Sequence, residues 1–148
     1  MSLILYFGSA YCVIEGSQVI HPTHSAALTT AIAKVESNMN PRAVGKLGER
    51  GLFQFRKRTW QATTNLPFDY AFDPVISQGV ALEHLNTLSE KFNKATKHMP
   101  AIHDLYAMWN VGFYGYKKRG FHVERCPATT RRKILAVQQH YIIILGKN

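Results

Sequence analysis

Between Ser25 and Ser37, apolar residues recur at every third or fourth position, which is the spacing of an amphipathic helix. The apolar stripe of this predicted helix consists of Leu28, Ala31, Ile32 and Val35. Glu36 follows Ile32 by four residues and therefore lies on the same stripe. A carboxylate on that face must find a partner or stay protonated near neutral pH, because burial penalises its charged form. Glu36 is therefore either paired or solvated, or suited to act as a general acid.

The rest of the chain alternates helical patterns with turns. Further helices are predicted over about 59–65, from 74 to about 92, from about 102 to 111 and from about 130 to 145. Asp73 is expected to cap the second of these, with Pro74 at its first position. Glycines at 45, 48 and 51 indicate turns, with a small extended element near Leu52–Phe55. Residues 113–120 are expected to form a loop, and residues 3–20 could be short strands or a helix.

Length and composition fit one folded domain. A chain of 148 residues, 46% of them hydrophobic, can bury a core of its own. We expect a single domain over 1–148, with 1–22 as an N-terminal extension packed on the core. The formal net charge of +9 favours polyanionic surroundings such as nucleic acid, anionic lipid or the acidic polymers of a bacterial envelope.

The N-terminus and the cysteines say little about the compartment. The apolar start of the chain has no basic segment before it and is too short to span a bilayer, so neither a signal peptide nor a transmembrane segment is predicted. Cys12 and Cys126 could form one disulfide or stay as free thiols, and we favour free thiols.

Three short motifs carry the candidate chemistry. They are Glu36–Ser37 at a helix end, Gly51–Leu52–Phe53–Gln54 after a glycine-rich turn, and Trp109–Asn110–Val111–Gly112 after a long helix. In order and spacing they resemble the lytic transglycosylase and goose-type lysozyme family, an SLT-like domain whose motifs are E-S, G-L-M-Q and Y-N-A-G. The resemblance implies a mainly α (α+β), lysozyme-like domain, with a small β element beside a catalytic cleft.

The resemblance assigns roles to individual residues. Glu36 is the expected catalytic acid and base, working without a second catalytic carboxylate. Ser37, Gln54 and Asn110 are expected to position the substrate, Phe53 and Trp109 to shape the cleft floor, and Tyr114 to stack on a sugar. Each also has a plainer interpretation: an ordinary turn for Gln54, core packing for Trp109, and a helix cap for Asn110.

This chain departs from the family motifs at three positions. Trp109 replaces a tyrosine whose hydroxyl lies near the catalytic carboxylate in relatives, so an indole N–H must substitute or that contact is lost. Phe53 replaces a methionine. Glu49 replaces an alanine and is a possible second carboxylate, which would favour a hydrolytic lysozyme, or else a solvated loop residue beside Lys46 and Arg50.

Other features point to weaker alternatives. No HExxH motif or Cys/His quartet occurs, so we expect no metal and no organic cofactor. The segment 114–119, YGYKKR, could stack bases of single-stranded nucleic acid or line the rim of a glycan cleft. Residues 131–133 are interpreted as a solvated face of the last helix.

The predicted function is cleavage of the β-1,4 bond between N-acetylmuramic acid and N-acetylglucosamine in peptidoglycan. The expected reaction is a non-hydrolytic transglycosylation that yields a 1,6-anhydro sugar. Alternatives are a hydrolytic muramidase with the same site, a basic nucleic-acid-binding module, and a murein binder without catalysis. We expect a monomer that acts on glycan strands and anionic envelope polymers of the cell wall, with no specific nucleic acid. Its origin would be a bacteriophage lytic enzyme or a bacterial envelope-remodelling enzyme.

Overall fold

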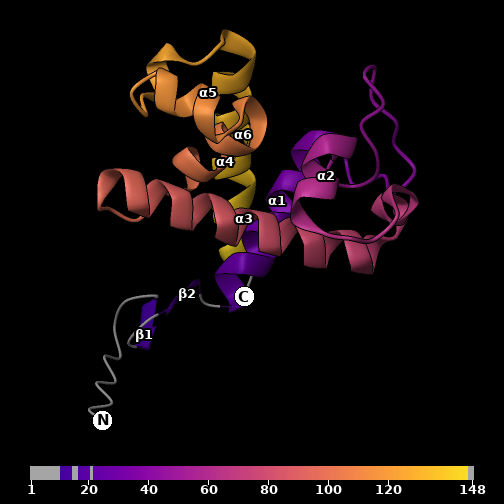
Figure 1. Ribbon diagram of the computed structural model, residues 1–148, viewed down its shortest axis with the longest axis horizontal. Coiled ribbons are helices and arrows are strands. Elements are labelled where there is room, and N and C mark those ends of the chain that lie inside the picture. Colours follow the sequence, from indigo (N-terminus) through magenta and orange to yellow (C-terminus); the bar gives the residue numbers. More distant parts are fainter. Residues whose placement is uncertain (1–10, 15–16, 21, 147–148) are drawn as a thin grey trace.

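The structure is built almost entirely from helices (Figure 1). The computed structural model describes residues 11–14, 17–20 and 22–146. The elements are β1 Tyr11–Ile14, β2 Ser17–Ile20, α1 Pro22–Ser37, α2 Lys57–Thr63, η1 Phe68–Phe72, α3 Pro74–Thr96, α4 Ile102–Val111, α5 Phe113–Lys118, η2 Val123–Arg125 and α6 Ala128–Leu145, where η marks 3₁₀ helices. The predicted mainly helical class is confirmed.

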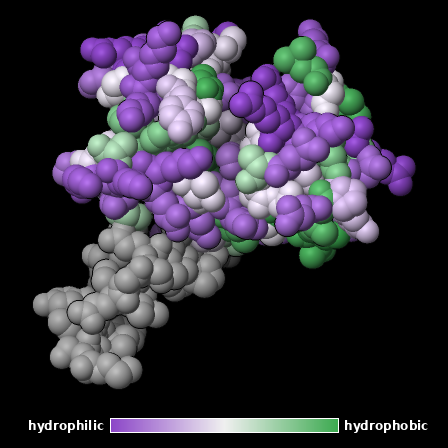
Figure 2. Space-filling view, viewed as in Figure 1, coloured by the Kyte–Doolittle hydropathy of each residue, from purple (hydrophilic) through white to green (hydrophobic). Residues whose placement is uncertain are grey.

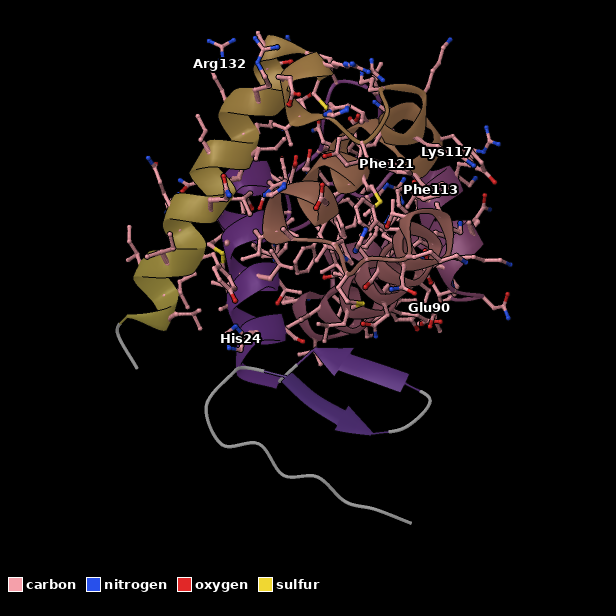
Figure 3. All side chains as sticks on the ribbon, turned by 90° about the vertical axis from the view of Figure 1, so that its left-hand side faces the viewer. His24, Glu90, Phe113, Lys117, Phe121 and Arg132 are labelled. Carbon is pink, nitrogen blue, oxygen red and sulfur yellow. The ribbon has the colours of Figure 1, made fainter. Side chains whose placement is uncertain are left out.

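Helices α1 and α6 lie side by side and run in opposite directions (Figure 3). At the start of α1, the His24 ring hydrogen-bonds to Tyr141 near the end of α6. At the other end of α1, Glu36 meets Lys133 in the first half of α6. Helix α4 also packs against α6. Three helices therefore converge near the C-terminal end of α1.

The core is formed by the inner faces of α1, α3, α4 and α6. The predicted stripe of α1 faces this core: Leu28, Ala31 and Ile32 are at most 2% exposed. Among the largest fully buried side chains are Trp60, Tyr106, Tyr116, Leu85, Met108 and Ile134. Cys126 is a buried free thiol, as expected, whereas the side chain of Cys12 lies outside the described residues.

Helix α3 crosses the width of the molecule, below α2, α4 and α5 in Figure 1, and begins where the sequence predicted. The carboxylate of Asp73 accepts hydrogen bonds of 2.9 Å from the backbone N–H groups two and three residues further on. These bonds satisfy amides that have no partner within the helix. The helix continues to Thr96, four residues beyond its predicted end, and Lys97 closes it in the left-handed conformation with φ of 64°.

The loop predicted over residues 113–120 is wrong, because Phe113–Lys118 form helix α5. Gly112, with φ of +77°, turns the chain between α4 and α5. Tyr116 of α5 is fully buried, and its hydroxyl donates a 2.7 Å hydrogen bond to Asp104 Oδ1 in α4. Burial of this side chain against a distant residue stabilises a helix that the short, glycine-containing sequence does not predict.

The region between α1 and α2 contains turns rather than the predicted small β element. Isolated bridges join Val44 with Arg50 and Arg50 with Phe55, but no regular strand forms over 38–56. Gly51 and Gln54 have positive φ values of 75° and 48°. A strand needs extended backbone at every residue, so Gln54 excludes a continuous strand over Leu52–Phe55, and Gly51 makes a turn just before it.

The N-terminal part of the described chain is a two-stranded antiparallel hairpin, in which Tyr11 lies opposite Ile20 and Ile14 opposite Ser17. The choice between strands and a helix for residues 3–20 is thus resolved in favour of strands where the chain is described. Figures 1 and 3 place the hairpin beyond the start of α1. Residues 1–10 lie outside the described residues, and a packed 1–22 extension stays a prediction.

Figure 2 shows one face of the molecule, which is mostly hydrophilic. Hydrophobic residues appear on it over the loop that follows α1, where Val44 and Leu47 are exposed. A notch in the upper outline separates this loop from the group formed by α4, α5 and α6. None of the helices in the described part of the chain combines the length and the apolar character that a membrane span requires.

Candidate active site

Glu36 lies in the last turn of α1, where α1, α4 and α6 meet. Its side chain is only 9% exposed. One carboxylate oxygen, Oε1, accepts a hydrogen bond from the hydroxyl of Tyr106. The other, Oε2, accepts one from the ammonium of Lys133 at 3.0 Å. The sequence left open whether this carboxylate is paired, and the structure shows it paired with two donors.

Tyr106 provides the hydroxyl that the sequence motif lacks. The family tyrosine is Trp109 here, but Tyr106 lies three residues earlier, on the preceding turn of α4. Its ring is fully buried. Burial, and then the nearby charge and hydrogen bond of Glu36, raise the pKa of Tyr106 far above its ordinary value, while a hydrogen bond from the Asn110 side chain lowers it. The hydroxyl therefore remains a proton donor to Glu36 at any ordinary pH.

Lys133 corrects the interpretation of residues 131–133 as a solvated face. Its side chain is 41% exposed, but its ammonium turns inward to Glu36. One indirect signal is present in the sequence: Lys133 lies one residue before Ile134, a core residue that is 2% exposed. An adjacent long side chain can lie along the helix and bring its charged end to the edge of the core.

Asn110 and Ser37 make hydrogen bonds that stabilise the helix ends around Glu36. Asn110 Oδ1 accepts a 2.8 Å hydrogen bond from the hydroxyl of Thr130, which links the end of α4 to α6. The Ser37 hydroxyl donates to the backbone carbonyl of Ala33, one turn earlier in α1, at 3.1 Å.

The glycine-rich motif forms a tight turn braced by Gln54. The Nε2 group of Gln54 donates to the carbonyls of Ala43 and Gly51 at 3.2 and 3.0 Å. A Cβ on Gly51 would lie 1.8 Å from the carbonyl oxygen of Ala71, so the close approach of backbone to backbone requires glycine. The ordinary turn considered for this motif is therefore present, with Gln54 as part of it.

Glu49 is held inside the same loop. Its carboxylate accepts a hydrogen bond from the backbone N–H of Leu47 at 3.0 Å and pairs with Arg56 at 3.3 Å. Burial by itself would raise the pKa of Glu49, but the backbone hydrogen bonds and then Arg56 outweigh it and lower the pKa. The Glu49 carboxylate therefore stabilises the loop through these contacts. Its role as a second catalytic carboxylate stays a prediction.

Phe53 and Trp109 belong to an aromatic cluster. Phe53 is 2% exposed, and its ring centre lies 6.3 Å from that of Trp109. Trp109 also contacts Phe55 at 5.3 Å and His84 at 5.2 Å. Burial, with a smaller effect from Lys91, lowers the pKa of His84 to about 4, so the ring in this cluster is neutral at pH 7. The sequence did not single out His84, since a lone histidine on a helix carries no motif.

Tyr114 and two surface hollows lie apart from Glu36. Tyr114 is 76% exposed on α5, where it contacts Phe113. Two surface hollows, of about 600 and 760 Å³, are lined by residues of α4–α6 and of the segment 47–69, and neither is lined by Glu36. Within the described residues, no three His, Cys, Asp or Glu side chains gather closely enough to hold a metal ion.

Comparison with known proteins agrees with this arrangement. One solved structure, an inactive variant of the lytic transglycosylase Slt from Pseudomonas aeruginosa, matches with a TM-score of 0.67 and 18% sequence identity. The match covers 82% of this chain but 22% of that one, so this chain spans less than a quarter of that protein. At this identity the likeness shows the fold. No curated protein matches the chain significantly.

Comparison with protein families shows more than the fold. The family described as transglycosylase SLT domain matches residues 18–118, which include α1 with Glu36, the glycine-rich turn and α4. This match covers more than half of the chain and agrees with the order of the three motifs. The chain therefore belongs to the transglycosylase SLT domain family.

Proposed function

We propose that this domain cleaves the β-1,4 bond between N-acetylmuramic acid and N-acetylglucosamine in peptidoglycan, with Glu36 as general acid and then base. One observation carries the proposal: a carboxylate that is nine-tenths buried lies where three helices meet, at the glutamate of the family motif. The proposal places the glycan strand in the notch between the loop after α1 and helices α4–α6 (Figure 2).

The proposed reaction has two proton transfers at one side chain. Protonated Glu36 donates its proton to the glycosidic oxygen as the bond from that oxygen to C1 breaks. The 2-acetamido carbonyl of the muramyl residue stabilises the positive charge that develops at C1. Glu36, now a carboxylate, takes the proton of the C6 hydroxyl as its oxygen bonds to C1. The product is a 1,6-anhydro sugar, and no water is consumed.

Tyr106 is proposed to orient Glu36 throughout this sequence. Its hydroxyl donates to Oε1 and stays protonated, so it fixes the carboxyl group while the second oxygen is the one that exchanges a proton with substrate. The engagement of Glu49 with Arg56 favours a mechanism with one catalytic carboxylate over a hydrolytic one with two.

The remaining roles are proposals of the same kind. Asn110 and Tyr114, both exposed, are available to substrate, whereas Phe53 would support the cleft from beneath. The net charge of +9 would favour encounter with anionic polymers of the envelope. Action on the cell wall as a monomer, and a bacteriophage or envelope-remodelling origin, complete this proposal.

The test compares wild type with Glu36→Gln on purified sacculi. Glutamine keeps the size of the side chain and can still accept from Tyr106, so folding and sacculus binding should be retained while lysis is lost. Unchanged lysis by Glu36→Gln would refute the role of Glu36. Failure of the wild type to clear murein, together with salt-sensitive binding to DNA, would favour the nucleic-acid-binding alternative.

A further inference from the structure

Both oxygens of Glu36 are occupied by donors of the protein itself. Tyr106 donates to Oε1 and Lys133 to Oε2, and the carboxylate side chain is 9% exposed. A general acid must come within about 2.6–3.2 Å of the oxygen it protonates. Because Tyr106 donates to Oε1, a glycosidic oxygen must approach Oε2, where the Lys133 ammonium at 3.0 Å competes for the same space.

Lys133 is the donor that can leave. Tyr106 is fully buried and its ring is packed in the core, so it has no alternative position. Lys133 is 41% exposed and ends a flexible four-carbon stem. Rotation of this stem removes the ammonium from Oε2 and opens the site without any movement of the backbone.

Among the described residues of α1, α4 and α6, which meet at Lys133, the displaced ammonium finds no free carboxylate. Helix α6 has no acidic residue, and the chain from Cys126 to its end has none either. Arg131 and Arg132 are its charged neighbours, and both are cations. On α4 the only carboxylate is Asp104, which already accepts hydrogen bonds from Tyr116 and from the backbone N–H of Ala101. A replacement anion for Lys133 must therefore arrive with the substrate.

We infer that Lys133 exchanges Glu36 for a carboxylate of the muramyl peptide, so that an anionic substrate frees the catalytic acid. This inference rests on the proposed function. The carboxylate belongs either to the lactyl group of a peptide-free muramyl residue or to the stem peptide. Lys133 is thus a positioning and specificity residue: an uncharged glycan provides no partner for it and leaves Glu36 blocked.

The test measures kcat and KM on native murein and on murein whose carboxyl groups have been converted to amides. Wild type should prefer native murein by about tenfold in kcat/KM, the size of one hydrogen bond to a charged group. Lys133→Met should abolish this preference, mainly through KM on native murein, and Lys133→Arg should restore it. Arg132→Met is the matched control, since Arg132 is exposed and points outward in Figure 3, and it should keep the wild-type preference.

Peptide-free and peptide-bearing glycan strands distinguish the two sources of the carboxylate. A loss in Lys133→Met on peptide-free strands alone assigns the lactyl carboxylate, and a loss on peptide-bearing strands alone assigns the stem peptide. A loss on both kinds of strand means that either carboxylate can pair with Lys133. If Lys133→Met does not fold, Lys133→Gln carries the same comparison, because its amide can still donate to Glu36.

Two negative results are distinguishable. A wild type that cleaves native murein, together with a Lys133→Met variant that keeps the full preference for native over amidated murein, overturns the inference alone. A wild type that cleaves neither substrate overturns the proposed function and, with it, the role of Lys133.

Discussion

Replacing Tyr106 by phenylalanine removes one hydroxyl from the interior and little else. The hydroxyl donates to Glu36, and the ring is fully buried, so the variant keeps the packing and loses the hydrogen bond. A hydrogen bond to a charged group contributes about 1.5–3 kcal/mol. We therefore expect the free energy of unfolding of Tyr106→Phe to fall by about 2 kcal/mol at pH 7. For a domain of this size, Tm should drop by roughly 4–8 °C.

The effect of Tyr106→Phe on the free energy of unfolding should depend on pH in a defined direction. The pKa of Tyr106 is raised in the folded protein, so above about pH 10 the unfolded chain loses a proton that the folded protein keeps. The contribution of the hydroxyl is fully present below pH 10 and declines above it. The difference in stability between wild type and Tyr106→Phe should thus be constant from pH 6 to 9 and shrink as the pH rises further.

Urea unfolding of both proteins, repeated in a Glu36→Met background, is the assay. Without the carboxylate, Tyr106→Phe should cost at least about 1 kcal/mol less than in wild type, because the two side chains interact directly. An equal cost in both backgrounds would refute the hydrogen bond as the source of the effect. The kcat of Tyr106→Phe on murein should also fall, since Glu36 loses its fixed donor.

Three further predictions concern the frame around the site. Gly51→Ala should lower the free energy of unfolding by more than about 3 kcal/mol, because the new Cβ would lie 1.8 Å from the carbonyl oxygen of Ala71 and the residue would keep a φ of +75°. A folded variant with the Tm of the wild type would contradict this prediction. As the pH falls from about 6.5 to 4, His84 gains a proton in the unfolded chain but not in the folded protein, so the free energy of unfolding should fall by up to about 3 kcal/mol. Urea titrations of His84→Gln should lack this pH-dependent loss. A variant with the pH profile of the wild type would refute the role of His84. Asp73→Ala should cost about 1 kcal/mol through the loss of two N-cap hydrogen bonds, whereas Asp73→Ser, which can still cap, should cost less; equal losses would argue against capping.

Features fixed by neighbouring residues could be predicted from the sequence. The stripe that ends in Glu36 follows from helical periodicity, and the start of α3 follows from Asp73 and Pro74. The end of α4 at Gly112 follows from glycine, which adopts the positive φ found there. Each signal lies within one or two helical turns of the residue that it positions.

Features fixed by distant residues could not be predicted. Tyr106 reaches Glu36 across 70 residues of sequence, and Lys133 reaches it across 97. Neither belongs to a motif, so nothing local marks them as partners of the carboxylate. Helix α5 was missed for the same reason, because the burial of Tyr116 against Asp104 outweighs the two glycines that indicate a loop.

The most direct test of the account is the mass of the products that the wild-type domain releases from murein. Transfer to the C6 hydroxyl predicts muropeptides that are lighter by one water than those of a lysozyme digest and that have no reducing end, and Glu36→Gln should release none. Reducing-end products of lysozyme mass would instead mean that water attacks C1, and the same anhydro products from Glu36→Gln would contradict the central role of this carboxylate.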